Sequence, residues 1–266
     1  MYWTLLLVAG LVGYGLSRSG AHFIFRPQKK RWPLQLPFES VQAGNLSGVY
    51  LPAQDKKPTL LFFHGRGGNV SHFENFARSY APLGYGVLMF DYRGFGLSQE
   101  SPSQKHIQAD ALQMVQYALK TLQIAPQQLV LYGHSLGNAP ALFAADYFKQ
   151  FPFKALILQS PFLSTPDMAA SWGLHTYAPG GWKYRLLRAL VTPFLWFNRF
   201  DNTRLTKGLT LPVLLCTSKE DKILPWQQSA KLADVIPHVK RFLSPTGGHD
   251  EFDWAAPAVD TFLQTR

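Results

Sequence analysis

Four unbroken apolar runs recur along the chain, and segments with helical periodicity lie between them. The runs are 59-TLLFF-63, 86-GVLMF-90, 155-ALILQS-160 and 212-PVLLCTS-218. A run with no alternating polar residues is typical of a strand that is buried on both faces, as in a parallel sheet. Strands that alternate with helices favour such a sheet with helices on both faces. We therefore expect an α/β fold with a mostly parallel sheet.

The weaker patterns extend this arrangement. Shorter strand-like runs lie at 38–42, 48–51 and 129–132, and helical patterns lie at 104–122, 136–147, 226–236 and 254–264. The chain has 266 residues, and α/β folds of roughly 200 to 250 residues often form a single unit. The sequence thus predicts one main domain over residues 31–266, preceded by a distinct segment at 1–30.

The alternation of strand and helix breaks between Pro161 and Lys207. This stretch contains Trp172, Tyr177, Trp182, Tyr184, Phe194, Trp196, Phe197 and Phe200. Ligands of an open parallel sheet bind at the carboxyl ends of its strands. We therefore predict that residues of about 162–207 form a short helical cap over that edge.

A serine between two glycines lies in 131-LYGHSLGNAPAL-142. The motif G-x-S-x-G is weak alone, but here it follows a strand-like run and precedes a helical one, as a nucleophile elbow requires. Pro140 departs from the pattern because it removes a backbone donor early in the predicted helix. The context identifies Ser135 as a candidate nucleophile.

A serine nucleophile needs a base to accept its proton and an acid to orient that base. Asp221 follows the strand at 212–218 in 218-SKEDKILP-225, and His249 lies in 247-GGHDEF-252. The order Ser, Asp, His along the chain is the order expected for a nucleophile elbow of this kind. Spacing favours Asp221 over the neighbouring Glu220 as the acid.

The same chemistry requires two backbone donors for an oxyanion. The amide of Leu136, at a predicted helix N-terminus, is one candidate. The loop 64-HGRGGN-69 offers the second donor, with the amide of Arg66 preferred to that of Gly67. We expect the Arg66 guanidinium to be free to meet a substrate anion or water.

With these residues the chain resembles the α/β-hydrolase-fold serine hydrolases. The resemblance runs from about residue 36 to 264 and includes HGRGGN, DYRGFGLS at 91–98, GHSLG, SPFLS at 160–164, KEDKILP and GGHDEF. Together with the apolar N-terminus, it points to a membrane-anchored subgroup with a small cap. It implies a triad of Ser135, Asp221 and His249 that acts on esters, thioesters or amides with an acyl chain.

Other polar residues near the predicted site have structural interpretations. We expect His134, His64 and Asp91 to hold loops by hydrogen bonds. The chain has one cysteine, and its eight histidines show no H-E-x-x-H or comparable spacing, so the sequence gives no support to a metal site. The predicted chemistry requires no cofactor.

The formal charge of +10 comes from two segments. Five Lys and Arg residues and no acid lie between Arg18 and Arg31, and six face only Asp201 between Lys183 and Lys207. No nucleic-acid-binding motif accompanies them. Because aromatic and aliphatic residues flank both segments, an anionic membrane surface is the expected partner.

Residues 2–16, YWTLLLVAGLVGYGL, carry no charge. A cleaved signal peptide and a buried helix are alternatives, but Tyr2 and Trp3 at one end and the basic cluster at the other favour a single membrane anchor. The excess of Lys and Arg after this segment predicts a cytoplasmic catalytic domain.

The sequence thus predicts a serine hydrolase that cleaves acyl esters or thioesters through an acyl-enzyme. Small molecules, lipids and lipidated substrates are the candidates. A serine peptidase or amidase of the same fold is the enzymatic alternative, and a non-catalytic binding protein is the alternative from another class.

Overall fold

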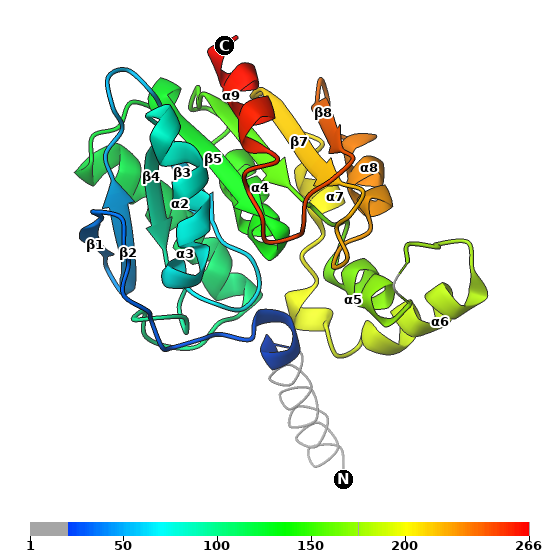
Figure 1. Ribbon diagram of the computed structural model, residues 1–266. Helices are drawn as coiled ribbons and strands as arrows, with labels where there is room; N and C mark the ends of the chain where they lie inside the picture. The colour runs from blue at the N-terminus through cyan, green and yellow to red at the C-terminus, as the bar shows by residue number, and fades with distance from the viewer. Residues whose placement is uncertain (1–20, 175, 266) are drawn as a thin grey trace.

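One twisted sheet organises the chain in the computed structural model, which describes residues 21–174 and 176–265 (Figure 1). Its strand order is β1-β2-β4-β3-β5-β6-β7-β8. The β1–β2 and β2–β4 pairs are antiparallel, and all the other pairs are parallel. The expected mostly parallel α/β sheet is confirmed.

The strands are β1 Glu39–Ala43, β2 Leu46–Leu51, β3 Thr59–Phe63, β4 Gly86–Phe90, β5 Leu129–His134, β6 Ala155–Gln159, β7 Val213–Ser218 and β8 Lys240–Ser244. The α-helices are α2 Glu74–Tyr80, α3 Gln104–Gln116, α4 Asn138–Tyr147, α5 Thr165–Leu174, α6 Trp182–Val191, α7 Asn202–Leu205, α8 Trp226–Ala233 and α9 Ala256–Gln264. Short helical turns are η1 Val70–Phe73, η2 Ala81–Leu83, η3 Tyr117–Thr121, η4 Pro126–Gln128, η5 Ser135–Gly137 and η6 Trp196–Asn198.

Hydrophobic side chains pack on both faces of the sheet. Alternate residues of a strand point to opposite faces, so in β3 Leu61 and Phe63 join one cluster while Leu60 and Phe62 join the other. Helices α3, α4 and α8 contribute to the first cluster, and α2 and α9 to the second. Figure 1 shows α2 and α9 in front of the sheet. This two-sided burial explains the unbroken apolar runs.

The segment between β6 and β7 forms the helices α5, α6 and α7 and the turn η6. Helices α5 and α6 lie together to one side of the sheet (Figure 1). Elsewhere the helical pattern at 104–122 divides, because α3 ends at Gln116 and continues as a π-helical turn, η3.

The prediction of a single N-terminal anchor with a cytoplasmic catalytic domain is corrected by the structure. Within residues 21–174 and 176–265, no helix has both the length and the apolar character needed to cross a bilayer. The apolar stretch on which the prediction depended falls on residues 1–20, outside the described residues. Ile24 and Phe25, which the sequence assigned to the segment 1–30, are fully buried in the main core.

The aromatic packing under α2 can be tested by truncation. Phe62 is fully buried, and its ring stacks on Phe76 with centroids 3.9 Å apart. Because truncation leaves a cavity, Phe62→Ala should lower the free energy of unfolding by roughly 3–5 kcal/mol in urea titrations. Val235→Ala, at an exposed position, should change it by less than about 0.5 kcal/mol. Equal effects of the two changes would contradict this packing.

Candidate active site

Ser135 lies at a sharp turn between β5 and α4. Its φ is +52°, a left-handed conformation that costs a non-glycine residue energy. A Cβ on Gly137 would lie 1.8 Å from Phe63 O, and one on Gly133 would lie 2.6 Å from Asn138 Cα. Both glycines are therefore required by close backbone approach. Pro140 falls in the first turn of α4, where its missing N–H has no intrahelical partner to lose.

The loops that follow β7 and β8 bring Asp221 and His249 to Ser135. His249 Nε2 lies 2.9 Å from Ser135 Oγ, and His249 Nδ1 lies 2.7 Å from Asp221 Oδ2. Because an ionised carboxylate only accepts hydrogen bonds, Nδ1 carries the proton and Nε2 is left to accept from the serine hydroxyl. All three side chains are buried. This geometry is the one that the predicted nucleophile, base and orienting acid require, and their catalytic roles stay predictions.

The carboxylate of Asp221 is held in its charged form. Burial alone would raise its pKa, but the hydrogen bonds from His249 and from the backbone N–H of Leu224 outweigh that effect and leave the pKa below its ordinary value. The second carboxylate oxygen accepts from the backbone N–H groups of Ile223 and Leu224, at 2.9 and 2.8 Å. The neighbouring Glu220 instead accepts from Gly247 N at 3.2 Å, so Asp221 and not Glu220 pairs with His249.

The loop 64–69 lies against the turn at Ser135. A Cβ on Gly65 would be 3.2 Å from Ser135 Cβ and 3.0 Å from His134 Nδ1. This contact places the loop that carries the Arg66 amide beside the turn that carries the Leu136 amide. The roles of both amides as oxyanion donors stay predictions.

The side chain of Arg66 differs from the expectation that it would be free. Its Nε and Nη2 donate to Phe23 O at 3.1 and 2.8 Å, and its Cζ lies 4.7 Å from the ring centroid of Trp172. Partial burial and the nearby Arg26 lower the pKa of Arg66 to about 10. The guanidinium thus joins the N-terminal segment to α5.

His134 and His64 are buried beside the site and hold loops. His134 Nε2 is 2.9 Å from His249 O, and His64 Nδ1 is 2.9 Å from Gly65 O. Burial lowers the pKa of each histidine to about 4. Neither ring lies within hydrogen-bond distance of Ser135 Oγ in the described structure.

One group of potential metal ligands occurs among the described residues: His134, His249 and Asp250. It includes His249, whose two ring nitrogens are already directed at Asp221 and Ser135. A metal ion on His249 would have to break that chain. These residues therefore suit proton transfer better than metal binding.

A cavity of about 400 Å³ opens beside Asp221. Its walls come from the loop bearing Arg66, from α5 and from the start of α8, and they include Trp172, Ile223 and Trp226. The volume lies within the range of small-molecule pockets. Polar and charged residues, among them Lys219 and Lys222, share the wall with these apolar side chains.

Comparison with known proteins places this geometry in a family. A family model described as the alpha/beta hydrolase fold matches residues 58–191 of the 266. The chain therefore belongs to the α/β-hydrolase fold family, a family of hydrolases.

The chain is also similar to individual proteins. YfhR of Escherichia coli O157:H7 is 27% identical over 258 residues, covering 92% of this chain and 85% of that protein. The lysophosphatidylserine lipase ABHD12 of Danio rerio is 31% identical over 227 residues, covering 79% of this chain and 58% of that protein. A crystal structure of an alpha-beta hydrolase from Vibrio vulnificus superimposes with a TM-score of 0.68 at 24% identity, covering 86% of this chain and 80% of that one.

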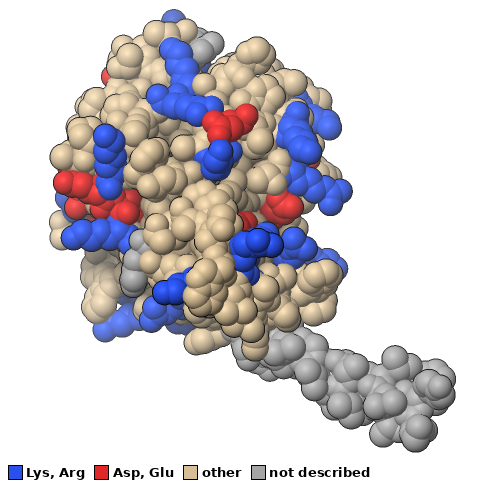
Figure 2. Space-filling view, turned by 90° about the vertical axis from the view of Figure 1, so that its right-hand side faces the viewer, with Lys and Arg blue, Asp and Glu red and all other residues tan. Residues whose placement is uncertain are grey.

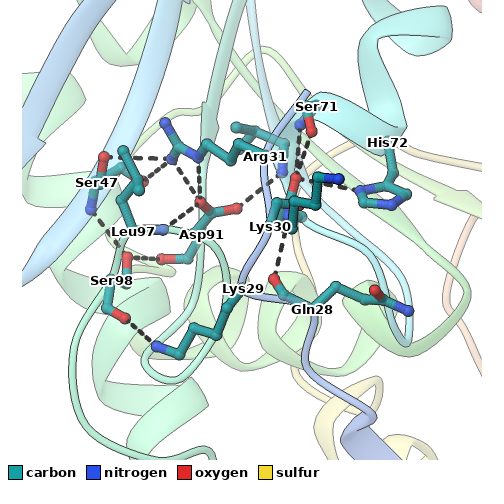
Figure 3. Close-up of polar contacts among 12 residues, drawn as sticks. Gln28, Lys29, Lys30, Arg31, Ser47, Ser71, His72, Asp91, Leu97 and Ser98 are labelled. Carbon is teal, nitrogen blue, oxygen red and sulfur yellow. Dashed lines mark hydrogen bonds and ion pairs between the residues drawn. The ribbon is translucent and has the colours of Figure 1, made fainter. Parts of the chain in front are cut away.

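Sequence reasoning missed the partners of the first basic segment. Arg31, expected at a membrane surface, instead pairs with the buried Asp91, and Lys29 Nζ donates to Ser98 O at 2.7 Å (Figure 3). The available signal was Asp91 itself, because a buried carboxylate at a strand end requires a cation or several donors.

The two buried histidines predict how stability depends on pH. Between their ordinary pKa of 6.5 and the lowered value of about 4, the unfolded chain binds a proton that the folded chain does not. The free energy of unfolding should therefore fall as the pH is lowered through this window. At pH 5 the loss should be about 2 kcal/mol for each histidine.

Urea titrations of the wild type and His64→Gln at pH 7.5 and pH 5 measure this effect. The variant should lose about 2 kcal/mol less than the wild type between the two pH values. An identical loss in both proteins would show that His64 does not titrate in this way.

Proposed function

We propose that the protein is a serine hydrolase that cleaves acyl esters or thioesters. The observation that carries the proposal is the buried hydrogen-bond chain from Ser135 Oγ through His249 to Asp221. The left-handed turn at Ser135 and the close approach of the loop 64–69 support it, because both are features of a nucleophile elbow with adjacent oxyanion donors.

In the proposed reaction, His249 Nε2 takes the hydroxyl proton of Ser135 as Oγ attacks the acyl carbonyl. The amides of Leu136 and Arg66 donate to the oxyanion, and Asp221 stabilises the imidazolium. The leaving group takes the proton from His249 as its bond to the acyl carbon breaks. Water then gives a proton to His249, attacks the acyl-enzyme and releases the acid, and the proton returns to Ser135.

A lipid or lipidated substrate is the class that the surroundings of the site favour. Trp172, Ile223 and Trp226 form the apolar part of the wall of the cavity beside Asp221, and this part suits an acyl chain. The name of the Danio rerio relative, a lysophosphatidylserine lipase, points in the same direction.

Removal of the proposed nucleophile or base tests the chemistry. Ser135→Ala and His249→Ala should each lower kcat for a short-chain p-nitrophenyl ester by on the order of 10⁴-fold or more. The nucleophile and the base act together, so the loss of either one disables the proposed triad. Fluorophosphonate labelling should occur in the wild type and vanish in Ser135→Ala. Glu220→Gln serves as the control, and it should keep activity within about threefold.

No labelling of the folded wild type would contradict the proposed function. Faster cleavage of aminoacyl amides than of acyl esters would favour a peptidase of the same fold.

We propose that the segment 162–207 acts as a cap. Its exposed side chains support a contact between this segment and anionic lipid. Large apolar side chains are exposed on and after α6: Trp182, Leu186, Leu190, Phe194, Trp196 and Phe197. Lys183 and Arg185 lie on the same helix, and Arg188 pairs with Asp167 at its edge. In Figure 2 the lower part of this face shows Lys and Arg around an uncharged surface. Such a pattern is typical of a helix that lies in a membrane interface.

A charge placed in this apolar surface tests the lipid contact. Leu186→Glu/Leu190→Glu should reduce binding to vesicles of anionic phospholipid and slow hydrolysis of a substrate presented in them by about tenfold or more. Hydrolysis of a water-soluble ester should stay unchanged. Val235→Glu, at an exposed position away from this segment, is the matched control. Unchanged vesicle binding in the double variant would contradict the lipid contact.

A further inference from the structure

The segment from Phe25 to Arg31 runs between two loops at the edge of the site. On one side, Gly67 N donates a hydrogen bond to Phe25 O at 2.9 Å, and Gln28 N donates one to Gly68 O at 3.3 Å. On its other side, Gln28 O accepts from Gly96 N at 2.8 Å. The segment is therefore bonded both to the loop 64–69 and to the loop 91–98.

Asn69 strengthens the contact with the first loop. Its Nδ2 donates to Gln28 O at 3.1 Å and to Lys30 O at 2.8 Å, while its Oδ1 accepts from Ser71 N at 3.1 Å. The side chain is fully buried. One side chain thus joins the end of the loop 64–69, the start of η1 and the N-terminal segment.

Asp91 and Arg31 form the centre of the network in Figure 3. Arg31 Nε donates to Asp91 Oδ2 at 2.8 Å, and Asp91 Oδ1 accepts from Val70 N at 2.8 Å. The carboxylate is fully buried, and a Cβ on Gly96 would lie 1.8 Å from Asp91 Oδ2. Asp91 therefore has little room to move, and through Val70 it fixes the backbone where the loop 64–69 ends.

The loop needs such restraint. Gly67 and Gly68 have φ of +72° and +64°, and glycine leaves the backbone free to adopt many other conformations. The amide of Arg66, the proposed oxyanion donor, immediately precedes them. An oxyanion donor works through its position, and an error of about 1 Å in the alignment of catalytic groups can cost on the order of 100-fold in rate.

We propose that the segment Phe25–Arg31, fixed by the Arg31–Asp91 pair, positions the loop 64–69 so that the Arg66 amide faces the oxyanion. Arg31 and Asp91 are positioning residues in this account, because they act through Val70 and Asn69 and do not touch the substrate. The inference rests on the proposed serine hydrolase function.

The test compares Arg31→Gln, Arg31→Lys and Asp91→Asn with the wild type on a water-soluble p-nitrophenyl ester. Fluorophosphonate titration counts the active sites, so that kcat refers to folded protein alone. Arg31→Gln and Asp91→Asn should lower kcat by 10- to 100-fold with KM within threefold. Both changes should also lower the affinity for an aryl boronic acid, which mimics the tetrahedral intermediate, by a similar factor. Arg31→Lys, which keeps the charge, should recover part of kcat.

The chain offers a matched control in Arg93 and Asp110. Arg93 Nε lies 2.6 Å from Asp110 Oδ1, and the two side chains are 18% and 0% exposed, against 16% and 0% for Arg31 and Asp91. This pair joins the loop 91–98 to α3, because Asp110 also accepts from Arg93 N at 2.8 Å. Arg93→Gln should lower the melting temperature but leave kcat per active site within threefold.

The outcomes separate the inference from the function on which it rests. In one outcome the wild type is active and labelled, and Arg31→Gln and Asp91→Asn keep its kcat and its affinity for the boronic acid. This outcome would overturn the positioning role alone. An equal loss of kcat in Arg93→Gln would also overturn it, because the effect would then not be specific to this pair. A wild type with neither labelling nor activity would instead overturn the proposed function.

Discussion

The close approach of the turn after β5 to the end of β3 is the constraint on which the site depends. Gly137 lies so near Phe63 O that no side chain fits there, and Ser135 is held at a positive φ. Strained backbone of this kind persists only when the surrounding structure determines it. The parallel pairing of β3 with β5 and the burial of both strands supply that support. The same pairing places the loop after β3 beside Ser135.

Two polar side chains from other loops meet Ser135 at this turn. Asp221 and His249 come from loops after β7 and β8, two strands that follow β5 and β6 in the sheet. Each loop is fixed locally: Asp221 Oδ1 accepts two backbone N–H groups, and Trp254 Nε1 donates to Gly248 O at 3.2 Å. A proton transfer from Ser135 to His249 therefore requires little rearrangement, which is what preorganised catalysis needs.

Much of this architecture could be predicted from the sequence, because the signals were local. Unbroken apolar runs indicate buried parallel strands. The places of Ser135 after the run 129–132 and of Asp221 after the run 212–218, with His249 further along the chain, predict that these residues meet. Their catalytic roles stay predictions. Long-range contacts gave no such signal: Arg31 and Asp91 are 60 residues apart, and Arg66 and Phe23 are 43 apart. The charge of the first basic segment and the aromatic and aliphatic residues beside it therefore predict a membrane surface, although Arg31 and Lys29 bind the domain's own loops.

The most direct test of the central claim is the detection of an acyl group on Ser135 during turnover. Rapid mixing with excess p-nitrophenyl ester, followed by acid quench and peptide mass spectrometry, measures both the released p-nitrophenol and the adduct. The account predicts a burst of p-nitrophenol of up to one equivalent per active site, with the acyl group on the peptide that contains Ser135. Full turnover by Ser135→Ala, or an adduct on a different residue, would contradict it.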